Sequence, residues 1–244
     1  MLSRLLLVAL VVGHPLQVIA QEEAPGSIPK PMVLRWWHGA VALGGLSALM
    51  LLDQPLQKFV QGGRSASKDD LAGTVRRFGQ IEVYGTVTAG LVAAGLLSGN
   101  EELTRTGGRL AATLAFVGAA GMAGKLVMGR PRPEDSPDAD AYVPFSGHGA
   151  MPSGHTAMAF AFATALSDEI HNPWAKVGLY TLATGVGWSR INDDRHWLTD
   201  VAAGAALGIT SAKLMSGRWR IFGLRPPGVL LGPSQAGLAW KVEF

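Results

Sequence analysis

Apolar segments of helical length recur along the chain and limit what it can fold into. Each holds about 12 to 18 uncharged residues rich in glycine and alanine, a composition that favours closely packed helices. The six segments span residues 36–52, 83–100, 110–124, 154–167, 177–189 and 197–215. A shorter, charged helix is expected over residues 68–77. The pattern predicts an all-α fold, a bundle of about six apolar helices with polar motifs at the helix ends.

Only the C-terminal tail alternates with the period of a β-strand. Apolar residues alternate with others from Leu238 to Phe244, and residues 232–235 have the composition of a turn. The tail, residues 223–244, is therefore expected to form a short β-hairpin packed on the helices. No strand pattern is found before residue 229.

The lengths of the apolar segments leave two environments open. A helix that crosses a bilayer needs about 20 apolar residues, and the segments fall short of this length. They fit either helices embedded in the bacterial inner membrane or a soluble helical bundle in the periplasm. We favour the embedded bundle, because 48% of the residues are hydrophobic and only 16% are charged.

Composition also excludes several classes of function. The net charge of +3 is too small to indicate a nucleic-acid-binding protein, and no basic stripe with interleaved aromatic residues is present. The chain has no cysteine, which excludes disulfides, thiolate metal sites and cysteine nucleophiles.

The N-terminus has the pattern of a secretory signal peptide. An arginine precedes a short apolar run, and small residues follow where a signal peptidase would cut. The alternative is a short helix that stays attached as an anchor. The expected organisation is a signal peptide over residues 1–20, a linker over 21–33, a helical domain over 34–222 with its motifs within 80–215, and the tail over 223–244.

Export would place the polar motifs in the periplasm, but the number of crossings conflicts with this. If the mature N-terminus lies outside, three crossings bring Lys125 to the cytoplasmic side. Either one segment does not cross, or the N-terminal helix must be counted differently.

Three polar clusters lie at ends of apolar segments. They read KLVMGRPRP from Lys125, PSGH from Pro152 and SRINDDRHWLTD from Ser189. Taken singly, Lys125, Arg132 and Arg190 suit cations at the border of an apolar helix. Taken together they can clamp an anion, because guanidinium groups match the geometry of phosphate.

The PSGH stretch combines a helix start with an imidazole. Ser153 can be the N-cap, and the free N–H groups and the dipole of the helix that follows favour a bound anion. Gly154 allows close approach, and His155 is placed to give a proton to a leaving oxygen. The alternative is an ordinary capped helix with an incidental histidine.

His196 and Asp200 are four residues apart, so they are expected to share one helix face. The carboxylate can accept a hydrogen bond from one ring nitrogen, which fixes the tautomer and leaves the other nitrogen free to attack. A surface hydrogen bond and a metal site with two ligands are the alternatives, although no third ligand is evident.

Other charged residues beside these clusters are expected to be structural. Arg130, Asp193, Asp194 and Arg195 are assigned to loops or salt bridges. His148 is a candidate for the entrance to the site.

The three clusters together resemble the type 2 phosphatidic acid phosphatase superfamily, which also contains bacterial class A acid phosphatases and vanadium haloperoxidases. The shared spacings are Lys-x6-Arg-Pro, Pro-Ser-Gly-His and Ser-Arg-x5-His-x3-Asp, and all three match without a departure. The resemblance covers residues 80–215.

The resemblance implies an active site at the helix ends and a role for each motif residue. The residues that would hold the phosphate oxygens are Lys125, Arg132, Ser153, Gly154 and Arg190. His196 would be the nucleophile and form a phosphohistidine, Asp200 would orient it, and His155 would protonate the leaving group. No metal and no other cofactor is implied.

The expected function is therefore hydrolysis of a phosphomonoester or diphosphate, carried by a membrane lipid, in the bacterial cell envelope. A soluble periplasmic acid phosphatase that acts on small phosphate esters is the main alternative. A vanadate-dependent haloperoxidase and a non-enzymatic envelope protein are the others. The expected partners are the phosphorylated substrate and the membrane, with no nucleic acid.

Overall fold

The protein is described by a computed structural model that covers residues 5–10, 30–170, 172–224, 228–232 and 235–243. Helices dominate these residues, and the expected all-α fold is confirmed. They are α1 Trp36–Met50, α2 Asp53–Gly62, α3 Ala66–Arg77, α4 Ile81–Ser98, α5 Glu101–Met128, α6 Gly154–Glu169, α7 Pro173–Asn192 and α8 Leu198–Met215. All six apolar segments and the charged helix predicted over 68–77 are present.

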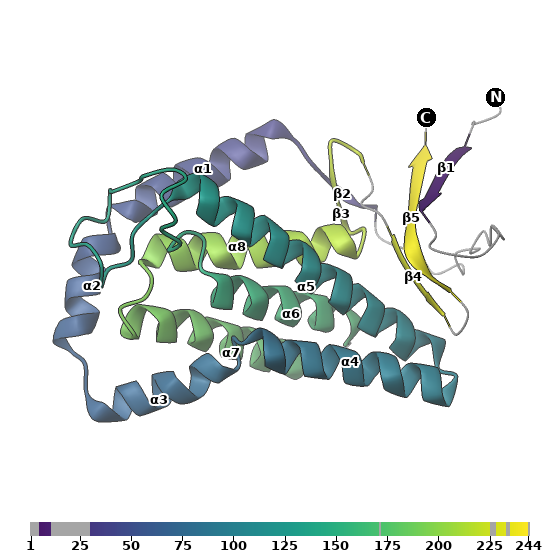
Figure 1. The fold of residues 1–244 in the computed structure, drawn as a ribbon, viewed down its shortest axis with the longest axis horizontal. Helices are drawn as coiled ribbons and strands as arrows, with labels where there is room; N and C mark the ends of the chain where they lie inside the picture. Colours follow the sequence, from purple (N-terminus) through teal and green to yellow (C-terminus); the bar gives the residue numbers. More distant parts are fainter. Residues whose placement is uncertain (1–4, 11–29, 171, 225–227, 233–234, 244) are drawn as a thin grey trace.

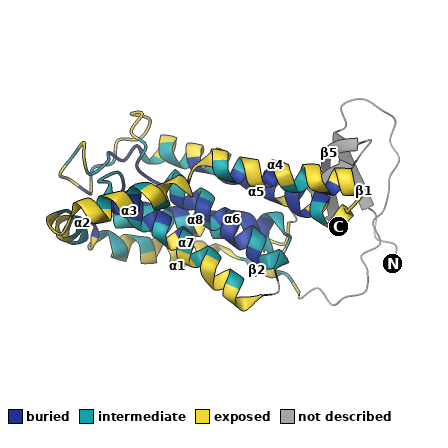
Figure 2. Cartoon of the chain, turned by 90° about the horizontal axis from the view of Figure 1, so that it is seen from below, coloured by how far each residue is buried: buried dark blue, intermediate teal, exposed yellow. Residues whose placement is uncertain are grey.

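Helix α6 lies at the centre of the bundle, with α5, α7 and α8 packed around it (Figure 1). Buried residues concentrate in these four helices, whereas α1 and the outer face of α4 are largely exposed (Figure 2). Helices α5 and α7 end where α6 and α8 begin. The loops after α5 and α7 therefore meet at one end of the bundle, which carries the three sequence motifs and which we call the catalytic end after the role that the family resemblance implies for them.

Local sequence sets where the long helices begin and stop. The Asn100 side chain accepts hydrogen bonds from the first turn of α5, and Asn172 does the same for α7 ahead of Pro173. Gly129 ends α5 in the left-handed conformation, with φ 54°, a conformation that glycine adopts without steric cost. This sharp stop releases the chain into the loop that carries Arg130 and Arg132.

The α6–α8 contact depends on glycines that let two backbones approach closely. A Cβ atom on Gly204 would lie 2.5 Å from the Ser153 carbonyl oxygen, and one on Gly208 would lie 2.3 Å from the Ala157 carbonyl oxygen. No real Cβ contact is that short. The abundance of glycine thus has a packing role at the helix pair that carries two of the three motifs.

The first apolar helix is shorter than the predicted 36–52 and is followed by a break. Helices α1 and α2 meet at an angle of 48°, and α2 begins at Asp53. Asp53 is fully buried because its carboxylate is bonded to groups of the catalytic end. The break between α1 and α2 therefore places the Asp53 carboxylate in the interior of the bundle.

Strands are more numerous than predicted. The expected tail hairpin is present as β4 Gly228–Gly232 and β5 Gln235–Glu243, and β4 lies against α5. The prediction of no strand before residue 229 is wrong, because Leu5–Leu10 forms β1 against β5, and β2 Met32–Leu34 pairs in parallel with β3 Trp219–Ile221. Strands of three residues have too short a pattern to be read from sequence. The rest of the predicted signal peptide lies outside the described residues.

Two continuous stretches are long and apolar enough to cross a membrane, namely Ala66–Ser98 and Glu101–Met128. The bent pair α1–α2 becomes a third if its two helices act as one span. These assignments rest on length and composition over the described residues. Large apolar side chains on their outer faces, such as Leu97 and Met122, are mostly exposed, as expected for helices that face lipid.

The close α6–α8 contact predicts that Gly208→Ala destabilises the bundle by about 1–3 kcal/mol, because the added methyl group overlaps the Ala157 carbonyl. The measurement is thermal unfolding of the purified chain. Gly90→Ala in α4 is the matched control, since nothing lies within 4 Å of its Cβ position, and it should stabilise the helix by up to about 1 kcal/mol. Equal shifts for the two variants would contradict the packing argument.

Candidate active site

The catalytic end brings residues of all three sequence motifs together. Lys125 and Arg190 lie in the last turns of α5 and α7, and His155 lies in the first turn of α6. His196 lies in the loop before α8, where the positive charges of Lys125 and Arg190 contribute to lowering its pKa. The prediction that the motifs converge from separate helix ends therefore agrees with the geometry.

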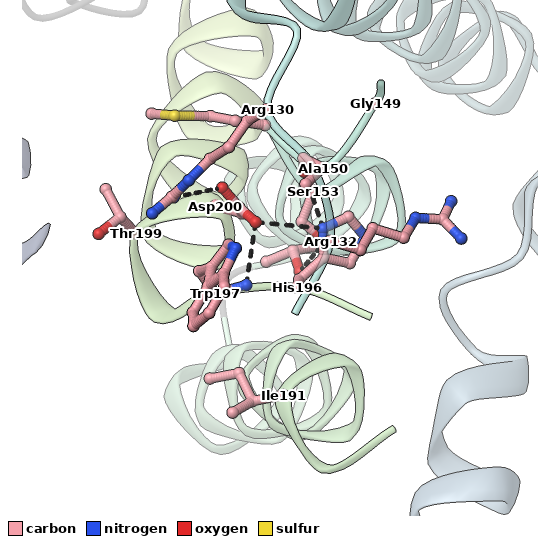
Figure 3. A network of polar contacts seen from close by, with 12 residues as sticks. Arg130, Arg132, Gly149, Ala150, Ser153, Ile191, His196, Trp197, Thr199 and Asp200 are labelled. Atoms are coloured by element: carbon pink, nitrogen blue, oxygen red, sulfur yellow. Dashed lines mark hydrogen bonds and ion pairs between the residues drawn. The ribbon is translucent and has the colours of Figure 1, made fainter. Parts of the chain in front are cut away.

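His196 is almost completely buried and its ring is held by the backbone. Its Nδ1 lies 2.8 Å from the carbonyl oxygen of Ala150 and 3.7 Å from the Asp200 carboxylate (Figure 3). A carbonyl oxygen can only accept, so this contact requires the proton on Nδ1 and leaves Nε2 with its lone pair. Burial lowers the pKa of His196, which keeps the ring neutral at neutral pH.

The helix-face argument for His196 and Asp200 needs a correction. His196 precedes the N-cap residue Trp197, whereas Asp200 lies in the first turn of α8. Asp200 accepts the backbone N–H of Trp197 at 2.9 Å, so its carboxylate caps the helix as well as facing the ring. The orienting role predicted for Asp200 is thus shared with the Ala150 carbonyl.

Arg130 is the residue whose importance sequence reasoning missed. The expected salt bridge is present, but the residue is fully buried and has two carboxylate partners, Asp200 at 2.7 Å and Asp53 at 2.6 Å, to which it donates. Asp53 in turn accepts the backbone N–H and the hydroxyl of Thr199, both at 2.8 Å. The one signal in the sequence for the importance of Arg130 is its position, two residues before Arg132 of the motif. Nothing in the sequence links it to Asp53.

The cations predicted to clamp an anion differ in burial. Arg190 is 6% exposed and is paired with Asp193 at 2.8 Å, and among the described residues its Nε is buried without a hydrogen-bond partner. The Lys125 amine donates one bond, to the Gly149 carbonyl at 2.8 Å, and keeps two further N–H groups. Arg132 is more exposed and lies 3.5 Å from Glu134, with its guanidinium directed away from Asp200 (Figure 3).

Ser153 is the N-cap of α6, as predicted, but its side chain does not cap the helix. The hydroxyl is fully buried and accepts from Thr156 at 2.9 Å, and the Ser153 N–H donates to the Asp200 carbonyl at 2.9 Å. The N–H groups of the first turn, including that of Gly154, thus have no side-chain cap. An uncapped, buried helix start favours an anionic ligand.

His155 lies in a setting that disfavours a positive charge. Burial lowers its pKa to about 4, and the charges of Arg190 and Lys125 act in the same direction. The turn between α3 and α4 packs on this residue, since a Cβ atom on Gly79 would lie 3.0 Å from the His155 Cβ. Sequence reasoning did not find Gly79. His148 is exposed, and its role at the entrance stays a prediction.

The arrangement can bind a tetrahedral anion and transfer a group to an imidazole. A neutral histidine with one free nitrogen lies among Lys125, Arg190 and an uncapped helix N-terminus, with a second histidine beside them. Within the described residues, no group of three or more histidine, aspartate or glutamate side chains could hold a metal ion.

Comparison with known proteins supports the family resemblance over part of the chain. The model of the PAP2 superfamily matches residues 106–220, which confirms over this region the resemblance to type 2 phosphatidic acid phosphatases. The chain is similar to the crystal structure of LpxE from Aquifex aeolicus, with 25% identity and a TM-score of 0.54 over 68% of this chain and 94% of that one. It also shares its fold with a transmembrane PAP2 type phosphatidylglycerolphosphate phosphatase from Bacillus subtilis, at 18% identity and a TM-score of 0.56 over 75% and 92% of the two chains.

Curated relatives match over a shorter region. Lipid A 1-phosphatase from Porphyromonas gingivalis is 44% identical over 108 residues, which are 43% of this chain and 22% of that protein. Lipid A 1-phosphatase from Rhizobium etli is 34% identical over 107 residues, 42% of this chain and 45% of that one. The chain thus spans less than half the length of these relatives. With the apolar helices, the similarities support a membrane-bound protein.

The low pKa of His155 predicts that anion binding takes up a proton. At pH 5.5 the free ring is neutral, and a bound dianion favours its protonated form. Sulfate is a suitable probe because it does not titrate in this range. Calorimetry in buffers of different ionisation enthalpy should show uptake of a fraction of a proton per sulfate. His155→Gln should bind without uptake, and unchanged uptake in that variant would assign the proton to another group.

Proposed function

We propose that the protein is a membrane-bound phosphatase that removes a phosphate group from a lipid through a phosphohistidine intermediate. One observation carries the proposal. The buried, neutral His196 has its Nδ1 committed to the Ala150 carbonyl, so Nε2 is the free nucleophile, and it lies within the field of Lys125 and Arg190. The PAP2 match over residues 106–220 supports the same chemistry.

In the first step, the lone pair of His196 Nε2 forms a bond to phosphorus while the bond from phosphorus to the ester oxygen breaks. The leaving oxygen keeps the electron pair and takes a proton from His155. The negative charge of the bound phosphate favours the protonated form of His155, which takes up this proton from solvent when the substrate binds, and this reconciles its low pKa in the free protein with a role as acid. Lys125, Arg132, Arg190 and the first turn of α6 would stabilise the phosphoryl oxygens.

In the second step, water attacks the phosphohistidine. His155, now neutral, takes a proton from the water as the oxygen–phosphorus bond forms. The nitrogen–phosphorus bond breaks and returns the lone pair to Nε2. The Ala150 carbonyl and the Asp200 carboxylate keep the ring in one tautomer and orientation through both steps.

The favoured substrate class is a lipid with a phosphate on its headgroup, because two similar proteins are named lipid A 1-phosphatases and the helices are apolar. The test is phosphate release from a panel of lipid phosphates and diphosphates in detergent, with para-nitrophenyl phosphate as a small ester. A rate on the small ester that exceeds every lipid rate would favour a small-ester phosphatase. Halide oxidation with added vanadate would indicate a haloperoxidase.

We further propose that the catalytic end faces the periplasm. Since α5 runs toward the catalytic end, the α4–α5 turn at Asn100 lies at the opposite end of the bundle. A reporter phosphatase fused after residue 147 should therefore be active outside the cytoplasm, and one fused after Asn100 should be inactive. The reverse pattern would place the site in the cytoplasm. Activity of both fusions would favour a soluble periplasmic bundle.

Loss of the nucleophile should remove the covalent route. His196→Ala is expected to lower the turnover number by several orders of magnitude and to leave the bundle folded, as judged by thermal unfolding and sulfate binding. The exposed His148→Ala is the matched control and should retain most of the activity. Retention of more than a few per cent of the rate by His196→Ala would rule out the assigned role.

Loss of the acid should depend on the leaving group. His155→Gln should reduce hydrolysis of an alkyl phosphate far more than hydrolysis of para-nitrophenyl phosphate, because a weakly basic leaving oxygen needs no proton. The ratio of the two rates in variant and parent protein is the measurement. Equal losses on both substrates would show that His155 acts in another way.

A further inference from the structure

A fully buried group of three charged side chains lies behind His196. Arg130, Asp53 and Asp200 have no exposed surface, and Arg130 lies between the two carboxylates. The group holds one positive and two negative charges, and therefore a net charge of −1. Buried charges usually occur in balanced pairs, because an unbalanced charge away from water is costly. The second buried carboxylate therefore needs an explanation.

Geometry shows that Arg130 alone does not require two carboxylates. Its Nη1 is satisfied by Asp200 at 2.7 Å, and its Nε and Nη2 both reach the Ala139 carbonyl, at 3.0 and 2.6 Å. The rings of Tyr142 and Trp197 lie 5.2 and 5.6 Å from its guanidinium carbon and add favourable cation–π contacts. Asp53 is therefore an additional anion on a cation that already has partners.

Apart from Asp200, the charged groups that act on the His196 ring are Lys125 from α5 and Arg190 from α7, both positive, although Arg190 is itself paired with Asp193. The same two cations disfavour positive charge on His155 of α6. Only Asp200, from the first turn of α8, acts in the opposite direction on His196, and its charge is largely balanced by Arg130. A ring that became cationic here would need a further negative charge.

Such a ring forms in the reaction proposed above. After Nε2 bonds to phosphorus with Nδ1 still protonated, the imidazole carries a positive charge. We infer that the buried carboxylate of Asp53, linked through Arg130 and Asp200, supplies the negative charge that stabilises the phosphorylated ring of His196. Asp53 is then a positioning residue that also sets the charge of the pocket. This inference rests on the proposed phosphohistidine chemistry.

The test starts from Asp53→Asn in the full chain, because asparagine keeps an acceptor for Thr199 and removes the charge. The turnover number should fall roughly ten-fold, the effect of one charge about 10 Å away at an effective dielectric constant of about 20. KM should stay within about two-fold, since Asp53 is not among the groups that hold the phosphate. The acid-labile phosphoenzyme trapped by rapid quenching should decline in parallel.

Asp168→Asn is the matched control for stability. Asp168 is a nearly buried carboxylate paired with Lys213 at 2.6 Å near the end of α6 opposite the catalytic end. Its replacement should lower the unfolding temperature without a change in turnover number. Equal turnover numbers for Asp53→Asn and Asp168→Asn would overturn the inference.

Asp53→Glu separates charge from geometry, because it keeps the negative charge and the Arg130 partner and changes only the length of the side chain. Its turnover number should exceed that of Asp53→Asn, whereas a turnover number equal to or below that of Asp53→Asn would mark a purely structural role and overturn the inference. If Asp53→Asn does not fold, Asp53→Glu is compared with the parent protein, and a loss of more than about ten-fold would overturn the inference. Absence of phosphate release by the parent protein would instead refute the proposed function, and the inference with it.

Discussion

The desolvated guanidinium of Arg130 is the interaction on which the catalytic end depends. It joins the start of α2, the loop after α5 and the start of α8 through bonds to Asp53, the Ala139 carbonyl and Asp200. Removal of one partner from a buried ion pair typically costs about 3–5 kcal/mol, because the other charge is stranded without water. The bonds of Arg130 therefore fix the positions of these three segments relative to one another. The Asp200 carbonyl fixes the start of α6 in turn, through the N–H of Ser153.

This arrangement explains how a nucleophile can lie in a loop and still be rigid. His196 has no helical hydrogen bonds of its own, but its neighbour Trp197 is bonded to Asp200 through the main chain and to the Pro131 carbonyl through the indole. The carbonyl of the loop residue Ala150 holds Nδ1 of the ring directly. A preorganised ring lowers the cost of reaching the transition state, because no reorientation is needed when the substrate binds.

Sequence predicted the parts of this protein that have a local pattern. Helical periodicity placed all six apolar helices, and the motif spacings identified Lys125, His155 and His196 as residues that meet. Other features were not predicted because they depend on contacts between residues far apart in the sequence, and three of them illustrate this. Asp53 has no local pattern that marks it as functional, since its partners lie 77 and 146 residues further along the chain. The Ala150 contact is made by a carbonyl, which carries no side-chain signal. Strand β2 depends on a partner 187 residues away.

The β2–β3 pair has a consequence for how the bundle is connected to the rest of the chain. It joins Met32–Leu34, just before α1, to Trp219–Ile221, just after α8, at the end opposite the catalytic end (Figure 1). The chain enters and leaves the bundle at neighbouring points, as in domains that tolerate insertion into another protein. Sequence attached on either side of the bundle therefore starts at the end away from His196, where added length does not have to pass the catalytic end.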